Sequence, residues 1–240
     1  MKTIFHLTIK SAIRDLYLLV WSLLIPVGGI FFTRFFIKDQ LYMQHISVGI
    51  VVASIIFYAF STTAYTIMVQ RKRGVYSLLK ITSMKLWEYV CSLSSAWVLI
   101  SMFFGLFIFS VCAAVFDIKI PLIAFITLLP VLIIGTAGYI FLAFFISSIA
   151  KNEAYMNMVT NLITFPLLLC SNAFYSLENA PLVFRIIKHI NPVQWFLNGI
   201  YATLDLNIQA YLTNIGLLLL FFFGMLGLSL KTFHNTNIYT

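Results

Sequence analysis

Charged side chains are scarce in this chain. Only 9% of its 240 residues are Asp, Glu, Lys or Arg, whereas 62% are hydrophobic. A water-soluble domain of this length could not hide so much apolar surface from water. The composition therefore excludes an ordinary soluble protein and indicates a chain whose solvent is lipid.

Acidic residues are the scarcest charged group, and all of them lie at or near the ends of apolar runs. They are Asp15, Asp39, Glu88, Asp117, Glu153, Glu178 and Asp205. Carriers driven by protons or sodium usually hold an acid or a broken helix at mid-membrane. The sequence thus disfavours ion-driven transport, and we expect the energy for any transport to come from outside the chain.

Motifs for nucleotide binding, metal binding and catalysis are also missing. The chain has no Gly-x-x-x-x-Gly-Lys-Ser/Thr phosphate loop, no His-Glu-x-x-His pair and no Gly-x-Ser-x-Gly elbow. Its three cysteines lie in or beside apolar runs without metal-ligand spacing, which is typical of small packing residues. We therefore expect no enzyme activity and no cofactor in this chain.

Long apolar runs make up most of the sequence. A helix of roughly 20 residues crosses about 30 Å of hydrocarbon, and about six runs are long enough. They are Leu16–Phe36, Ile46–Met68, Val90–Phe116, Ile120–Ile149, Tyr155–Phe174 and Ala210–Leu230. Because the runs are continuous rather than alternating, they favour helices over a barrel. The sequence predicts an all-α membrane protein with six transmembrane helices in a single domain, residues 1–240.

The net charge of +8 would suggest a nucleic-acid partner in a soluble protein. In a membrane protein, Lys and Arg instead gather on the cytoplasmic side, and here they favour one side by about two to one. This bias predicts a multi-pass protein of a bacterial-type plasma (inner) membrane, with both termini in the cytoplasm. It also predicts no nucleic-acid partner, and we expect no removable signal peptide.

Residues 1–15 carry a basic stripe. Lys2, His6, Lys10 and Arg14 recur every fourth residue, and the apolar side chains fall mostly on the other side. Such a helix lies in the headgroup plane rather than across the bilayer. It would anchor the first span, or it would serve as an elbow that also touches a cytoplasmic partner.

A basic cluster, Arg71-Lys72-Arg73-Gly74, separates two long apolar runs and must lie at a membrane surface. After it, one face of a short helix is formed at i, i+3, i+4 and i+7 by Val75, Leu78, Leu79 and Thr82. This helix could float on lipid headgroups, or it could dock into a groove on a soluble protein.

Residues 176–205 form a broken outer element. Ser176–Pro181 is turn-like, Leu182–Ile190 is a half-polar helix, and Val193–Leu204 is an apolar helix too short to cross. Asn191-Pro192 separates the two helices, because proline lacks an amide donor and disfavours helix at the preceding residue. The pattern indicates a re-entrant or interfacial hairpin.

The order of these segments resembles the membrane subunit of type-2 ATP-binding-cassette (ABC) exporters. Arg71–Ser83 is similar to that family's Glu-Arg-x-x-Gly-Thr-x-Glu-x-Leu-x-x-Thr-Pro loop. Ser176–Pro181 with Asn191–Trp195 is similar to its Pro-Leu-x-x-Leu-Pro and Asn-Pro-Leu-x-Tyr elements. The chain departs from the pattern where the loop acids are replaced, with Ser77 near the second acid, and where Ser83 stands for proline.

The resemblance implies roles for both stretches. Residues 71–86 would be a coupling loop that docks a cytoplasmic ABC ATPase, through Arg71, Lys72, Arg73, Gly74, Val75, Leu78 and Leu79. Residues 176–205 would form the outer gate, with Glu178, Pro181, Asn191, Pro192 and Trp195. ATP and Mg would be bound by the ATPase subunit, and a second permease copy or a homologue would complete the pore.

The resemblance also implies a class of cargo. Exporters of membrane-active peptides, bacteriocins or hydrophobic drugs are the first expectation, and lipid-linked glycan export is the second. The alternative function is a stand-alone secondary transporter or channel, which would need a polar site at mid-span around Asn157, Thr160 and Asn161. An intramembrane enzyme is least favoured, since no catalytic pair is visible.

Overall fold

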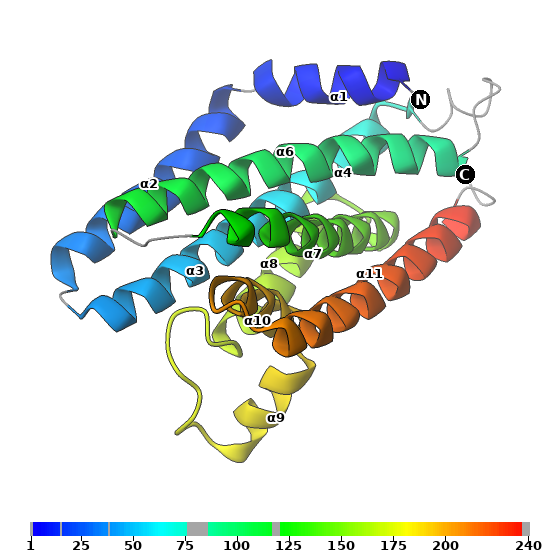
Figure 1. Ribbon diagram of the computed structural model, residues 1–240. Coiled ribbons are helices and arrows are strands. Elements are labelled where there is room, and N and C mark those ends of the chain that lie inside the picture. Colours follow the sequence, from blue (N-terminus) through cyan, green and yellow to red (C-terminus); the bar gives the residue numbers. More distant parts are fainter. Residues whose placement is uncertain (1, 15, 38, 76–85, 117–120, 237–240) are drawn as a thin grey trace.

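The computed structural model describes residues 2–14, 16–37, 39–75, 86–116 and 121–236 of the chain. Every regular element in these ranges is helical (Figure 1), as an all-α protein requires. The elements are α1 (Lys2–Arg14), α2 (Leu16–Phe36), α3 (Gln40–Ile56), η1 (Phe57–Thr62), α4 (Thr63–Lys72), α6 (Leu86–Val115), α7 (Leu122–Ile149), α8 (Glu153–Leu169), α9 (Leu182–Ile190), α10 (Pro192–Leu204) and α11 (Ile208–Thr236).

Four helical stretches among the described residues are long and apolar enough to cross a bilayer. They are His45–Lys72, Trp87–Val115, Leu122–Ile149 and Ile208–Thr232. The first predicted span coincides with α2, which has 21 residues, and the fifth corresponds to α8, which has 17 residues. A multi-pass helical membrane protein is confirmed by these stretches, whereas the arrangement with six spans stays a prediction.

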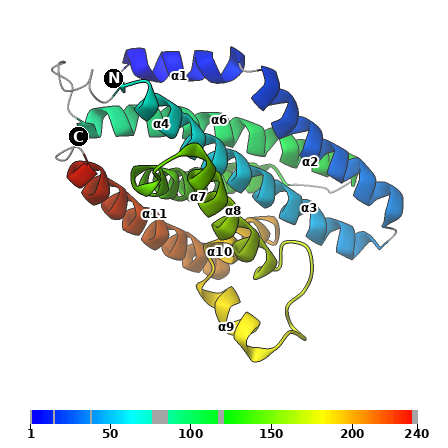
Figure 2. The same ribbon diagram turned by 180° about the vertical axis from the view of Figure 1, so that it is seen from behind.

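Helix α7 forms the centre of the molecule. The helices α4, α6, α10 and α11 all pack against it, and it lies between them in both views (Figures 1 and 2). Its contact with α11 is close because Gly138 leaves room for the ring of Phe221, to which a Cβ would come within 2.6 Å. The ring of Phe221 also lies 5.3 Å from that of Tyr139. This packing of aromatic rings joins α7 to the last span.

Helix α1 lies alongside α6 (Figures 1 and 2). Its contact face is the row Ile4, Thr8 and Ala12, spaced by four residues, of which Thr8 and Ala12 are buried. The basic stripe faces outward, since Lys10 and Arg14 are exposed. The amphipathic helix is thus present, and its position in the headgroup plane stays a prediction.

The second predicted span contains a π-helical segment. It begins in α3, continues through η1 and ends with α4, so His45–Lys72 is one unbroken helical run of 28 residues. A π-helical turn accommodates an extra residue and is frequent at functional sites. The sequence of η1 contains no Gly or Pro that could have indicated it.

The break predicted within residues 176–205 is present, and α9 has the predicted bounds, whereas α10 begins at Pro192 instead of the predicted Val193. Helix α9 spans Leu182–Ile190, Asn191 follows it, and Pro192 opens α10. The prediction was wrong for the preceding span, which was expected to run to Phe174. Helix α8 ends at Leu169, and a turn follows, in which the backbone N–H of Cys170 donates to the Pro166 carbonyl.

Candidate coupling, gating and cargo sites

Within the basic cluster, Arg71 forms hydrogen bonds with the end of α7. Its guanidinium Nη1 donates to the backbone oxygens of Ser147 at 3.2 Å, Ser148 at 3.4 Å and Ala150 at 3.1 Å. These carbonyls lie at the end of α7, where helix carbonyls lack partners within the helix and the helix dipole is negative. A cation that donates there caps the helix and joins α4 to α7.

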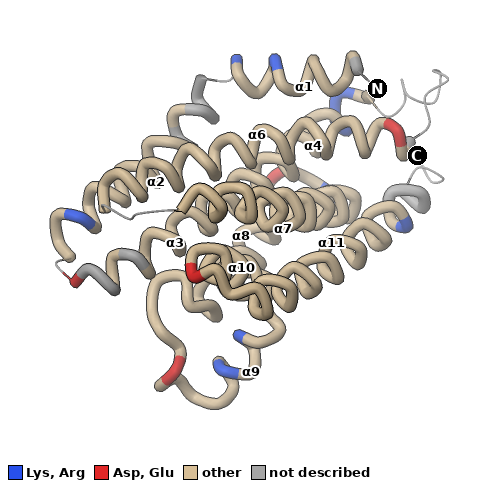
Figure 3. The backbone as a smooth tube through the Cα atoms, in the orientation of Figure 1, with Lys and Arg blue, Asp and Glu red and all other residues tan. Residues whose placement is uncertain are grey.

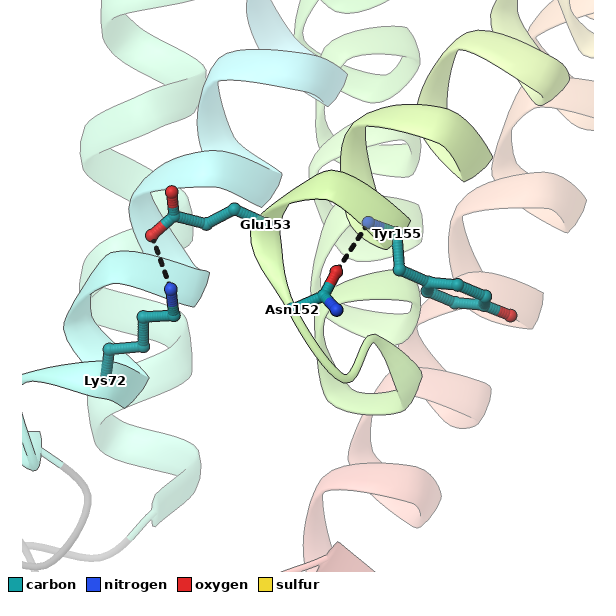
Figure 4. Close-up of polar contacts among 4 residues, drawn as sticks. All are labelled: Lys72, Asn152, Glu153 and Tyr155. Carbon is teal, nitrogen blue, oxygen red and sulfur yellow. Dashed lines mark hydrogen bonds and ion pairs between the residues drawn. The ribbon is translucent and has the colours of Figure 1, made fainter.

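A second contact joins α4 to the start of α8. Lys72 Nζ lies 2.9 Å from Glu153 Oε1, and Figure 4 shows the two side chains directed toward each other. Beside them, Asn152 caps α8, because its Oδ1 accepts from the backbone N–H of Tyr155 at 2.7 Å. Glu153 stands in the first turn of α8, where the helix dipole favours an acid. We call Arg71, Lys72 and their four partners the α4 clamp.

The other predicted coupling residues follow the α4 clamp directly. Arg73 is exposed, and Gly74 has φ of +72°, a left-handed conformation that favours glycine at the end of a helix. Val75 is half-buried and packs against the core. Leu78 and Leu79 lie outside the described residues, so the predicted coupling helix is untested.

Charged residues lie mostly at the ends of the long helices and in the outer element (Figure 3). Figure 3 shows almost uncharged tubes along the middles of α6, α7 and α11. This distribution suits a bilayer, because a charge at its centre is costly.

The outer element is held by Asn191, a predicted gate residue. Its Nδ2 donates to the carbonyls of Leu167 at 2.6 Å and Cys170 at 3.0 Å, at the end of α8. Its Oδ1 accepts from the backbone N–H of Val193 at 2.9 Å and so caps α10. Only 1% of this residue is exposed. One buried amide therefore joins the end of one helix to the start of another.

The remaining predicted gate residues take different positions. Pro192 occupies the first turn of α10, and Trp195 donates from Nε1 to the carbonyl of His189 at 2.8 Å. Glu178 is exposed in the loop before α9, and Pro181 directly precedes that helix. The structure thus brings Asn191, Pro192 and Trp195 together and leaves Glu178 on the surface.

Two contacts that the sequence did not indicate join the start of α3 to the outer element and to the turn before it. Tyr42 donates from its hydroxyl to the Phe174 carbonyl at 3.1 Å, and Tyr201 donates to the His45 carbonyl at 3.0 Å. Burial and the nearby Asp205 carboxylate raise the pKa of Tyr201, which keeps this hydroxyl protonated as a donor. No local sequence signal could have indicated these partners, since they lie more than a hundred residues apart.

Gly49 allows a close approach between α3 and the turn that leads from α8 into the outer element. A Cβ on Gly49 would lie 1.7 Å from the backbone oxygen of Ala173, so only glycine fits. Ala173 is itself fully buried. This turn is therefore seated on the start of the same helical run whose far end carries the α4 clamp.

An apolar cavity of about 510 Å³ opens between α2, α3 and η1. The π-helical segment contributes to its wall, and so does Phe174 from the turn that precedes the outer element. The lining residues are Ile25, Pro26, Gly29, Ile50, Ala53, Ser54, Phe57, Tyr58, Thr62 and Phe174. Because none of these side chains is charged, the cavity suits an apolar molecule or part of one.

The mid-span polar residues of the alternative function do not form a cluster. Thr160 is buried and donates to the backbone oxygen of Asn157 in its own helix at 3.1 Å. The side chains of Asn157 and Asn161 are exposed on α8. Within the ranges that the structure describes, no group of three or more His, Cys, Asp or Glu could hold a metal ion.

These observations define the class of protein as a multi-pass helical membrane protein. The ABC-2 type transporter family matches residues 1–204, which is most of the chain, and the chain belongs to that family. The predicted relationship to type-2 ABC permeases is thus confirmed. The match ends before α11. No curated protein matches the chain.

Proposed function

We propose that this chain is the permease subunit of an ATP-driven exporter, energised by a separate cytoplasmic ATPase that binds ATP and Mg. The family supports a transporter membrane component, and the chain itself has no phosphate loop. In this proposal both termini lie in the cytoplasm of a bacterial-type inner membrane, and a second copy or a homologue completes the pore.

The α4 clamp is the main observation in support of the proposed coupling role. The segment proposed to dock the ATPase, residues 71–86, begins within the last turn of α4. Since Arg71 and Lys72 connect that turn to the end of α7 and the start of α8, a force on the segment would act on three helices at once. Coupling between distant sites needs such a physical connection to a movable element.

The apolar cavity supports the proposed class of cargo. Its uncharged lining favours a hydrophobic or amphipathic substrate, such as a membrane-active peptide, a bacteriocin or a drug. A lipid-linked glycan is the second candidate, because its lipid part could use the same wall. A stand-alone carrier or channel has less support, since Thr160 bonds within its own helix and Asn157 and Asn161 face outward.

The first test asks whether an ATPase subunit binds to the chain. The tagged chain is purified from native membranes in mild detergent, and the copurifying proteins are identified by mass spectrometry. We expect a soluble subunit with a phosphate loop. Replacing Leu78 and Leu79 with Asp should abolish its recovery, because the two changes put charge on the apolar docking face.

Ser77→Asp is the matched control for this pull-down. In the predicted coupling helix, Ser77 would lie on the opposite side from Leu78 and Leu79, so the same type of charge should leave the ATPase bound. The amount of chain in the membrane should be equal for all variants. Undiminished recovery of the ATPase with the double Asp variant would contradict the proposed coupling segment.

A further inference from the structure

A second pocket, of about 560 Å³, lies between α9, α10 and the start of α11. It differs from the apolar cavity because side-chain amides supply about half of its wall. Its lining residues are Asn172, Lys188, His189, Gln194, Trp195, Asn198, Asn207, Gln209, Ala210, Thr213, Asn214 and Leu217. We call it the amide pocket. Among these lining residues there is a lysine and a histidine but no Asp or Glu.

For several of these side-chain amides, hydrogen bonds within the protein occupy either the oxygen or the NH₂ group. The other group of the amide then remains available to a ligand. The backbone N–H of Asn172 donates to Gln194 Oε1 at 2.7 Å, so that atom of Gln194 must be the oxygen. Gln194 Nε2 is then the donor to Asn198 at 2.7 Å, and the accepting atom is Asn198 Oδ1. The amide nitrogen of Asn198 therefore stays available to the pocket.

The same reasoning applies to two further amides. Asn172 Oδ1 accepts from the backbone N–H of Leu177 at 3.1 Å, and Asn207 Oδ1 accepts from that of Ala210 at 3.1 Å. In both residues the oxygen is used by the protein, and the NH₂ group is the remaining end. The pocket lining thus contains three amide donors and Lys188, while Asn214 uses its Nδ2 on the Ala210 carbonyl at 2.7 Å and leaves its oxygen as the remaining end.

A wall rich in donors, with a cation and no acid, selects a ligand rich in acceptors. Phosphate is such a ligand, since its oxygens accept several hydrogen bonds and its charge is paired by lysine. The volume exceeds that of one phosphate group, which leaves room for the group attached to it. We propose that the amide pocket binds a phosphate group, carried by a phospholipid headgroup or by free inorganic phosphate.

Helix α9 favours the lipid source. Lys188 and His189 line the pocket, while the opposite face of the same nine-residue helix is apolar and exposed. That face consists of Leu182, Val183, Ile186, Ile187 and Ile190. A helix with these two faces lies at a membrane interface, where headgroups and acyl chains meet. This site does not depend on the proposed ATPase, so the two can fail separately.

The test measures lipid retention on the purified full chain by native mass spectrometry, during titration with phosphatidylglycerol in detergent. Asn198→Asp is the main variant, because it keeps an oxygen to accept from Gln194 and replaces the pocket donor with a negative charge. We expect it to weaken retention by about tenfold, the loss of one charge-assisted hydrogen bond. Lys188→Gln should weaken retention similarly.

Two matched controls carry the same charge changes outside the pocket. Asn179→Asp adds an acid to the exposed loop before α9, and Arg185→Gln removes a cation from α9 itself. Both should retain lipid like the unmodified chain. Far-ultraviolet circular dichroism confirms folding of each variant, and Lys188→Gln decides the result if Asn198→Asp is misfolded.

Inorganic phosphate distinguishes the source. If it raises the unfolding temperature of the unmodified chain but not of Lys188→Gln, and lipid retention is equal in both, the site takes free phosphate. If pocket variants lose lipid and controls do not, the site takes a headgroup. Equal losses in pocket and control variants, or no response to either ligand, would overturn the proposal.

Discussion

At the scale of single residues, Arg71 joins two helices through its side chain. Its charge places it at the membrane surface, and its planar guanidinium supplies several donors in a fixed geometry. Three carbonyls at the end of α7 accept from one of its nitrogens. The Lys72–Glu153 pair beside it is a weaker contact, since both side chains are substantially exposed and such pairs contribute only about 0–1 kcal/mol.

Replacing Arg71 with Met should therefore lower the free energy of unfolding by about 1–3 kcal/mol, because the α7 carbonyls lose a charged donor. Arg71→Lys should recover part of this loss, since it keeps the charge without the planar geometry. The measurement is SDS-induced unfolding of the purified chain. Arg73→Met is the control, because Arg73 is exposed. An equal loss in both Met variants would refute the capping role.

The sequence predicts that Arg71 lies at a membrane surface, but it could not predict the partners of its guanidinium. Lipid rejects charge, so a basic cluster between apolar runs must lie at a surface. Its hydrogen-bond acceptors are 76–79 residues further along the chain, and backbone carbonyls carry no residue-type signal. For the same reason the amides that meet in the amide pocket were not predicted as a group.

At the scale of elements, local signals decided which boundaries could be predicted. Helix α9 is flanked by Pro181 and by Asn191-Pro192, and its predicted bounds were correct. For α8 the local signal was overlooked, because the predicted span was carried through the polar Ser171 and Asn172 to Phe174 although the helix ends at Leu169. The π-helical η1 has no local signal, since its residues also form ordinary α-helix.

Gly49→Ala tests the packing onto α3 of the turn that leads into the outer element. The added methyl would meet the backbone oxygen of Ala173, so the turn and α3 must separate, at a cost of about 1–3 kcal/mol. Limited proteolysis after Lys188 should become faster, because the outer element that follows the turn is less tightly held. Gly216→Ala is the matched control on α11, where a Cβ meets nothing within 4 Å, and it should leave both properties unchanged. Unaltered proteolysis of Gly49→Ala would contradict this packing.

At the scale of the whole molecule, hydropathy and segment order were sufficient to predict a helical membrane protein of the ABC-2 transporter family. Neither could predict that α7 lies at the centre, because its apolar sequence is like that of lipid-facing helices. The described residues leave the coupling helix untested. They do connect the outer element and the α4 clamp through the single helical run from His45 to Lys72.

Filling the apolar cavity tests whether cargo uses it. Gly29 lines the cavity, and a Cβ there meets nothing within 4 Å, so Gly29→Leu should place its side chain in the open space. Efflux of a hydrophobic fluorescent probe from cells that express the chain should fall several-fold. Gly28→Leu is the control, because Gly28 is equally unobstructed and does not line the cavity. Equal efflux by both variants would remove the cavity from the transport path.

The side-chain caps also bear on the order of membrane insertion during synthesis. An uncapped carbonyl is costly in hydrocarbon. Arg71 is synthesised before α7, so its guanidinium is already present when the carbonyls at the end of that helix leave the ribosome. Asn191 follows the carbonyls of Leu167 and Cys170 by 24 and 21 residues, so the end of α8 must wait for its cap. A pause in translation before Asn191 would therefore leave the end of α8 without its cap, whereas the end of α7 would not be affected in this way.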